Sequence, residues 1–406
     1  MSQTDTVRPV PAAAASHPGI SRGMTLLLAT ATGAIAANLY YAQPLLEAIA
    51  RSVGTSAGAA GGIVTVTQLG FALGLLFVLP LADIVERRSL LTVLLLLDAA
   101  ALAAVGLAPG PAIALVAFAT LGLANVAAQV LVPAAAHLAD DAQRGRTVAS
   151  VISGLLAGML LARTVAGIVT ELVGWRPLFL GAAGLMIVVN LVLHRALRGM
   201  DVRSGRGLGY GEVLRSTVRI YQADALVRVR SAYGALGFAA FSIFWSTAAL
   251  QLGRSPFGYS PAVIGLFGLL GAAGAMAANL TGRVRRPTHP MPTGVAVALI
   301  AIAFAVLLIA GRTLGGIIAG VLVLDIGVQG LHVLNQRVIY DVDESARNRV
   351  NSIYMGFYFV GGALGSAAAS FMWSQAGWSG ICLTGLGVTA LASLLWARTS
   401  FRGSKV

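Results

Sequence analysis

The sequence predicts an all-α polytopic membrane protein, with about twelve transmembrane helices arranged in two six-helix halves. Composition is the first reason: 57% of the 406 residues are hydrophobic, only 11% are charged, and the mean hydropathy is +0.83. A soluble chain of this length cannot bury so much apolar surface. The second reason is that the apolar residues form long stretches with the charges between them, each long enough for a helix that crosses a bilayer. In lipid such a span must satisfy its own backbone hydrogen bonds, which a helix does.

Each predicted span is an apolar stretch bounded by charged or turn-forming residues. In the N-terminal half, residues 24–197, we expect spans at 24–49, 60–82, 89–108, 111–137, 148–172 and 177–197. In the C-terminal half, residues 231–397, we expect them at 231–252, 261–282, 291–310, 314–339, 350–376 and 379–397. A cytoplasmic linker at 198–230 joins the halves, and cytoplasmic tails are expected at 1–23 and 398–406.

Arginine is distributed unequally between the two sets of loops. An even number of spans places both termini on one side, and the paired arginines fall in the loops of that side. The opposite loops hold only Arg51, Arg176, Arg254 and Arg312. By the positive-inside rule both termini are cytoplasmic, and the net charge of +13 is explained without nucleic acid. The arginine- and alanine-rich usage suggests a bacterium, so the expected location is its inner membrane.

The chain repeats two short motifs at one spacing. Arg144-Gly-Arg146 recurs as Arg347-Asn-Arg349, and Gly174-Trp recurs as Gly377-Trp. Both offsets equal 203, since 347 − 144 and 377 − 174 agree, and this is half the chain length. Two motifs repeated at this offset predict two halves of the same topology, related by an axis along the membrane normal.

Several motifs resemble the major facilitator superfamily. The segment Leu79-Pro-Leu-Ala-Asp-Ile-Val-Glu-Arg-Arg88 resembles the signature loop between its second and third spans, with Leu79 and Glu86 in place of glycines. Four further segments resemble a bacterial drug-resistance or efflux-type subgroup of this superfamily. They are Asn38–Pro44, Arg144–Arg146, Gly174–Arg176 and Asn351–Tyr354. The resemblance implies the major facilitator fold and transport by alternating access. The Gly-Pro typical of the fifth span in efflux members is replaced here by Ala162-Arg163.

Charges inside spans need an explanation because burial in lipid is costly. Arg163 lies past the middle of the fifth span. One interpretation is a fixed positive charge that faces a central cavity and binds an anionic substrate group or influences a carboxylate. The other is a structural arginine in a permanent pair. Asp98 lies midway along the third span, which is usually peripheral in the fold that the resemblance implies, so no cavity role is expected for it; it is either protonated or tied to a neighbouring helix.

The tenth span carries a polar stripe. Asp325 is followed at helical spacing by Gln329, His332 and Gln336, at offsets of four, seven and eleven residues. Asp325 and His332 are the candidates for proton coupling, since a carboxylate in the membrane responds to changes in hydration and histidine can relay a proton. The alternative is a hydrogen-bonded stripe that fixes helix packing.

Spans one, four, seven and ten line the cavity in the fold that the resemblance implies. Polar and aromatic side chains on these spans, with the charge in span five, suit a moderately apolar organic solute, although each could instead join helices together. The substrate-cavity candidates are Asn38, Tyr41, Gln43, Asn125, Gln129, Arg163, Trp245, Gln329 and Gln336.

The signature loop predicts a gate on the cytoplasmic side. An aspartate at the end of span two, Asp83, can accept hydrogen bonds from the exposed amides at the start of span eleven, near Val350 and Asn351. A simple positive-inside anchor would explain the arginines but not the aspartate. The gate candidates are Asp83, Arg87, Arg88, Arg144, Arg146, Arg347 and Arg349.

The sequence contains no phosphate-binding loop and no Cys/His cluster with metal spacing, so we expect no cofactor, no metal and no enzyme activity. The expected function is secondary active transport of a small organic solute, most simply as proton-coupled efflux by a monomer, with the solute, protons and the lipid bilayer as its partners. Uptake of a small organic anion, with Arg163 as the counter-charge, is the alternative. A membrane sensor or enzyme fits poorly, because the longest loop has only about 30 residues.

Overall fold

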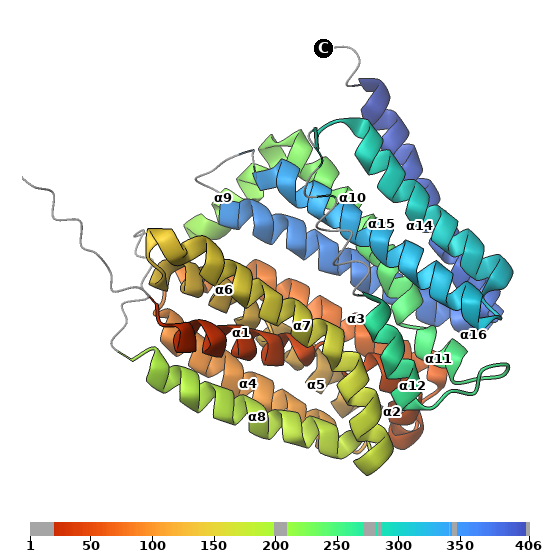
Figure 1. The fold of residues 1–406 in the computed structure, drawn as a ribbon, viewed down its shortest axis with the longest axis horizontal. Coiled ribbons are helices and arrows are strands. Elements are labelled where there is room, and N and C mark those ends of the chain that lie inside the picture. Colours follow the sequence, from red (N-terminus) through yellow and green to blue (C-terminus); the bar gives the residue numbers. More distant parts are fainter. Residues whose placement is uncertain are drawn as a thin grey trace, which may run out of the picture.

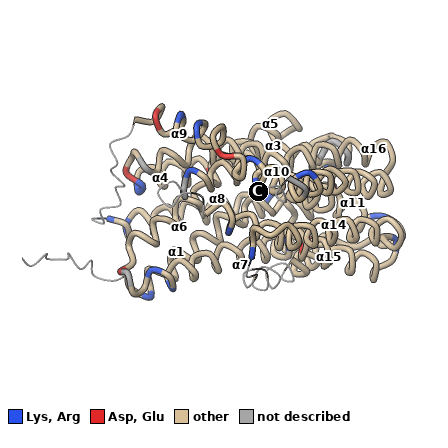
Figure 2. Tube along the Cα trace, turned by 90° about the horizontal axis from the view of Figure 1, so that it is seen from above, with Lys and Arg blue, Asp and Glu red and all other residues tan. Residues whose placement is uncertain are grey.

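The computed structural model describes residues 20–198, 209–271, 281, 284, 286–340, 342 and 347–402. Its ordered elements over these residues are all helical, as predicted, and they form two bundles side by side (Figure 1). Nine of the described helices are long and apolar enough to cross a membrane, and two shorter apolar helices accompany them. Figure 2 shows long uncharged stretches, with Lys, Arg, Asp and Glu mostly at helix ends. This pattern is what a lipid-embedded bundle requires.

The N-terminal bundle contains the elements up to residue 196. They are α1 (Arg22–Ala37), η1 (Gln43–Leu45), α2 (Leu46–Val53), α3 (Ala57–Leu73), the π-helical η2 (Gly74–Val78), η3 (Leu79–Asp83), α4 (Arg87–Leu107), α5 (Pro111–Ala124), α6 (Ala127–Leu138), α7 (Asp141–Val173) and α8 (Trp175–Ala196). Helix starts carry the expected signals: the Ser21 hydroxyl accepts the Met24 amide at 3.1 Å, and Pro111 occupies the first turn of α5.

A short amphipathic helix, α9 (Tyr210–Ala223), precedes the C-terminal bundle. The elements of the bundle are α10 (Ala225–Trp245), α11 (Ala248–Leu252), α12 (Pro261–Leu266), η4 (Phe267–Gly271), α14 (Pro290–Ala310), α15 (Leu314–Tyr340) and α16 (Arg347–Arg402). The Asp224 carboxylate caps α10, so this helix starts six residues before the predicted span at 231. The remaining linker residues, 199–208, and the tails 1–19 and 403–406 lie outside the described residues, as does most of 272–283.

Three predicted spans are broken instead of continuous. The first span stops at Asn38 and restarts as η1 and α2, the fourth breaks between α5 and α6 at Asn125, and the seventh breaks at Ser246. Pro44 explains part of the first break, because proline lacks the amide hydrogen that would continue a helix. At each break a backbone amide bonds to the carbonyl three residues earlier, as Tyr40 does to Ala37 and Gln129 to Val126, so hydrogen bonding continues through the middle of the bundle.

The repeat seen in the sequence has a structural counterpart. Gly174 joins α7 to α8 at φ 89°, and Gly377 joins the two helices merged in α16 at φ 54°. Both positions need the left-handed backbone that glycine adopts readily. In each half the tryptophan that follows is buried. The equivalent turns support two halves of one topology.

Small residues bring helices close together. A Cβ on Gly158 would lie 2.0 Å from the Gly33 carbonyl oxygen, so α1 and α7 are in backbone contact there. Between the halves, a Cβ on Gly167 would lie 2.2 Å from the Pro261 carbonyl oxygen. The boundary between the bundles is therefore formed by α7 against α12 and by α3 against α16.

Candidate substrate and coupling site

Arg163 lies at the boundary between the two halves and is only 6% exposed. Its Nε donates to Gln43 Oε1 at 2.7 Å, so α7 is joined to the broken first span. Aromatic rings surround the guanidinium: its Cζ is 4.3 Å from the Trp245 ring centroid and 4.9 Å from that of Tyr40. Phe241 adds a third ring at 5.9 Å. An arginine held by an amide and aromatic faces is stabilised without a carboxylate in direct contact.

Asp325 completes this arrangement from the other half. The Trp245 Nε1 hydrogen donates to Asp325 Oδ1 at 3.3 Å, while the face of the same indole carries Arg163. Asp325 is 2% exposed. A buried cation of the N-terminal half and a buried carboxylate of the C-terminal half are thus separated by one tryptophan. We call Gln43, Arg163, Trp245 and Asp325 the central cluster.

The central cluster has free hydrogen-bonding capacity. Arg163 Nη2 and Asp325 Oδ2 are buried, and neither has a partner among the described residues. Gly271 of η4 lies beside Asp325, where an added Cβ would be 3.4 Å from Oδ2. A buried donor and a buried acceptor that remain unpaired can bind a polar group of a solute, a water molecule or a proton. The geometry therefore fits both interpretations of Arg163, as a binding group and as a partner of a carboxylate.

His332 has a different set of neighbours from Asp325. Its Nδ1 lies 2.9 Å from the Tyr354 hydroxyl, and its ring lies 4.7 Å from that of Tyr358. Gln329 and Gln336, on the same helix, are half-buried. Two members of the predicted stripe, Asp325 and His332, therefore have different neighbours in the bundle.

Arg230 is a buried charge that the sequence analysis missed. It is 6% exposed, and its Nη1 donates to Thr293 Oγ1 at 3.0 Å and to Asn335 Oδ1 at 3.4 Å. It follows a run of linker arginines, so it was counted with the loop charges. The signal that could have placed it inside a helix is Asp224, a helix-capping residue six positions earlier. Tyr40 and Phe241, which contact Arg163, were also not among the predicted site residues.

Three predicted cavity residues lie in the interior of the N-terminal bundle. Asn38 Nδ2 donates to Asp98 Oδ2 at 2.8 Å, and Asn125 Nδ2 donates to the Ile35 carbonyl oxygen at 2.6 Å. Tyr41 is buried against the ring of Phe179. The first two residues thus gather around Asp98 of α4, a residue for which no cavity role was expected.

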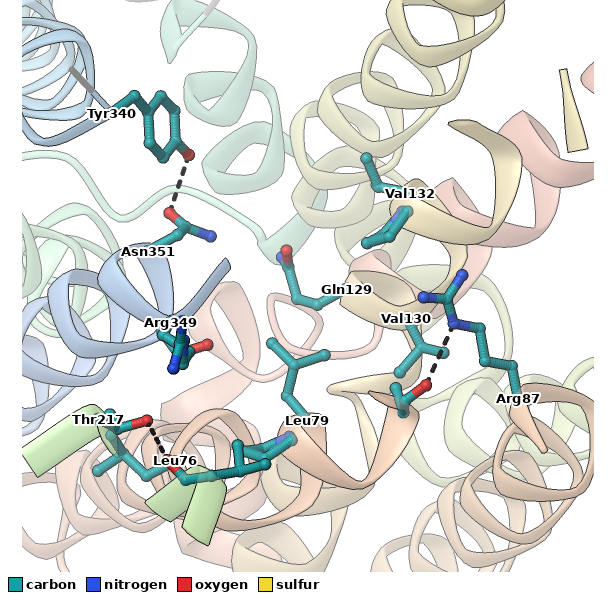
Figure 3. Close-up of a pocket in the computed structure, with 15 residues that line it drawn as sticks. Leu76, Leu79, Arg87, Gln129, Val130, Val132, Thr217, Tyr340, Arg349 and Asn351 are labelled. Carbon is teal, nitrogen blue, oxygen red and sulfur yellow. Dashed lines mark hydrogen bonds between the residues drawn. The ribbon is translucent and has the colours of Figure 1, made fainter. Parts of the chain in front are cut away.

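A cavity of about 210 Å³ lies between the halves at the level of η3 and the start of α16 (Figure 3). Gln129 of α6 reaches into it, opposite Asn351, whose Oδ1 accepts the Tyr340 hydroxyl at 2.9 Å. Val213 and Thr217 of α9 close one side of it. The linker helix therefore covers a polar space to which both halves contribute.

Two of the predicted gate residues, Arg87 and Arg349, line this cavity. Arg87 Nε donates to the Ala82 carbonyl oxygen at 3.2 Å, and Arg349 Nη1 donates to Ser216 Oγ at 3.0 Å. Arg88 Nε donates to the His194 carbonyl oxygen and Arg144 Nε to that of Ala136, so these two stabilise their own bundle. Arg146 is exposed beside a lateral groove between α1 and α7. The side chains of Asp83 and Arg347 lie outside the described residues.

Comparison with known proteins agrees with this architecture. Residues 28–340 match the family model of the Major Facilitator Superfamily. The chain is 42% identical over 381 residues to the uncharacterized transporter YgaY of Escherichia coli O157:H7, with 93% of this chain and 96% of that protein covered. It is 32% identical over 410 residues to a probable transporter of Streptomyces coelicolor, with 100% of this chain and 93% of that protein covered.

The fold has solved counterparts. The crystal structure of a bacterial homologue of the human lysosomal transporter Spinster, inward-facing and unoccupied, matches with a TM-score of 0.73 at 13% identity, over 93% of this chain and 96% of that one. The family model and these relatives identify the chain as a membrane transporter. The chain belongs to the Major Facilitator Superfamily.

Proposed function

We propose that this protein is a secondary active transporter that moves a small organic solute by alternating access, as proton-coupled efflux across the bacterial inner membrane. The observation that carries the proposal is the contact of Trp245 with both Arg163 and Asp325 at the boundary between the halves. Both termini are proposed to be cytoplasmic, since the paired arginines lie on that side.

The central cluster supports coupling for an electrostatic reason. An ionised Asp325 attracts Arg163 across the indole and holds the two halves together at this level. A proton on Asp325 removes that attraction and its acceptor role toward a bound solute. Solute and proton then compete for Asp325 in the central cluster. Such competition is what exchange of the solute against protons requires.

The cavity beside η3 supports a route from the cytoplasmic side. It is lined by apolar side chains of η2, η3 and α6 together with Gln129, Asn351 and Ser352. Such mixed lining suits an amphiphilic organic solute. Asp83, at the end of η3, and the start of α16 flank this space, so their separation or contact would control access to it.

Uptake of a small organic anion is a second candidate. The unpaired Nη2 of buried Arg163 favours it, because a guanidinium with a free N–H is a good partner for a carboxylate. In this alternative the carboxylate of the solute is the counter-charge of Arg163. Asp325 does not serve as that counter-charge, because Trp245 lies in contact with both side chains.

The test begins with a thermal-stability screen of purified protein against organic cations, zwitterions and carboxylates. A stabilising compound is then used in flux assays with reconstituted vesicles under an imposed proton gradient. Efflux predicts that solute moves against the proton flow, whereas proton-driven anion uptake predicts movement with it. Flux that is unaffected by the gradient, with any stabilising compound, would contradict proton coupling.

A further inference from the structure

A second buried carboxylate lies in the N-terminal bundle. Asp98 of α4 is 0% exposed, and its Oδ2 accepts the Asn38 amide at 2.8 Å. Asn125, also 0% exposed, contacts the same carboxylate. The central cluster does not use these three residues, which we call the Asp98 cluster.

Two helix ends meet at the Asp98 cluster. Asn38 is the C-cap of α1, and Asn125 is the C-cap of α5. The Asn125 amide also donates to the Ile35 carbonyl oxygen in the last turn of α1. Helix C-termini carry partial negative charge, and neither helix has a basic residue in its last turn. The Asp98 carboxylate therefore lies beside the C-terminal end of α1 and the junction between α5 and α6.

The hydrogen-bonding groups of the cluster do not balance. Asn38 Oδ1, Asp98 Oδ1 and Asn125 Oδ1 are all buried acceptors without a partner among the described residues. Each amide nitrogen uses one of its two N–H groups, Asn38 toward Asp98 and Asn125 toward the Ile35 carbonyl oxygen. Three buried acceptor oxygens therefore face only two remaining N–H groups, and an acceptor left unpaired is costly inside a membrane protein. A positive ligand would remove that cost.

We propose that Asp98, Asn38 and Asn125 form a binding site for a monovalent cation, either a proton or a sodium ion. Oxygen ligands from interrupted helices are the type of environment that holds such ions in transporters. Tyr41 is the titratable side chain that interacts with Asp98 from outside the cluster. Because Asn38 and Asn125 end α1 and α5, the bound ion fixes the bends of the first and fourth spans relative to α4. This inference is independent of solute identity and of any role for Asp325.

The experiment uses the purified full-length protein in the absence of solute. One arm measures thermal stability while sodium chloride replaces choline chloride at constant ionic strength. The other arm records infrared spectra between low and high pH for the carbonyl band of a protonated buried carboxyl. Both arms are run on wild type, on Asp98→Asn and on Asp325→Asn, which is the matched control with a buried carboxylate removed elsewhere.

A sodium site predicts stabilisation by sodium in wild type and Asp325→Asn but not in Asp98→Asn. A proton site predicts a carboxyl band that is present in wild type and Asp325→Asn, that disappears at high pH, and that is absent in Asp98→Asn. If Asp98→Asn does not fold, Asn125→Ala serves instead. Loss of one oxygen ligand should then shift the sodium or proton midpoint by about tenfold. The proposal is overturned if wild type shows neither response, or if either response persists unchanged in the substituted proteins.

Discussion

The guanidinium of Arg163 lies 4.3 Å from the centre of the Trp245 ring, so a cation of the N-terminal half rests on an aromatic face of the C-terminal half. This contact is strongest when water is excluded, and Arg163 is almost fully buried. It ties the conformation of α7 to that of α10 at the centre of the protein. Any movement between the halves must change it.

Replacement of Arg163 should separate a binding role from a structural one. Arg163→Lys keeps the charge but loses the Nε–H that donates to Gln43, so solute affinity should fall at least about tenfold. Arg163→Ala should lose binding but keep the fold. Thermal stability and solute binding are measured on the same samples. Arg176→Lys, which removes an arginine from the Trp175 ring, is the control and should leave solute binding unchanged. Early melting of Arg163→Ala would favour the structural role.

Asp325→Asn mimics a permanently protonated carboxyl. This variant should bind solute and exchange it across vesicle membranes, but it should not concentrate it against a gradient. Trp245→Phe keeps an aromatic face for Arg163 and loses the donor to Asp325, so it should weaken coupling less than Asp325→Asn. His332→Ala should have a mild effect, because His332 bonds to Tyr354 instead of Asp325. Full gradient-driven accumulation by Asp325→Asn would show that this carboxylate does not couple transport.

Asp83→Asn should weaken the proposed cytoplasmic gate. The lost interaction with a helix start is expected to be about 0.3–1 kcal/mol, which changes the ratio of closed to open forms by up to about fivefold. Val132→Cys, on the wall of the cavity, reports access to it after the single native cysteine, Cys382, is replaced by alanine. Labelling of Val132→Cys from the cytoplasmic side should become faster. Asp140→Asn, which removes a carboxylate charge at a helix start within one bundle and keeps an oxygen that can accept the Gln143 amide, is the control. Equal labelling rates in both variants and wild type would argue against the gate.

Two glycine substitutions should have different consequences. Gly158→Ala places a methyl group against the Gly33 backbone within one half, so it should lower stability by about 1–3 kcal/mol. Gly167→Ala places a methyl group against Pro261 of the other half, so this substitution should separate α7 from α12. A cysteine at Ala248, which is 4% exposed near Arg163, should then become more accessible to a thiol reagent added opposite the proposed cytoplasmic side. If Gly167→Ala lowers stability but leaves this accessibility unchanged, the contact with Pro261 does not control access to Arg163.

The sequence predicts features whose cause is local. Span positions follow from hydropathy over about 20 residues, and the turns at Gly174 and Gly377 follow from a repeated dipeptide. Arg163 and Asp325 could each be singled out because a charge in a span is costly. The link between Arg163 and Asp325 through Trp245 could not be predicted from the sequence, because it depends on how the two halves of the chain pack together.

The failures have the same physical origin. The breaks at Asn38 and Asn125 interrupt stretches that remain apolar on both sides, so hydropathy does not detect them. The bond between Asp98 and Asn38 could not be read from hydropathy either, because it depends on how the third span packs beside the interrupted first span. Burial of Arg230 depends on Thr293 and Asn335, more than 60 residues further along the chain.

The one-residue connections at Gly174 and Gly377 have a mechanical consequence. A single residue keeps the end of one helix within a few ångströms of the start of the next. A displacement of α7 at Gly174 is therefore passed on to α8, and the two segments of α16 are linked in the same way at Gly377. Rotation of one helix against the other remains possible about the glycine dihedrals, but the two helix ends cannot move apart. A loop lengthened at Gly174 would leave the central cluster chemically intact and yet loosen the connection between α8 and the helix that carries Arg163.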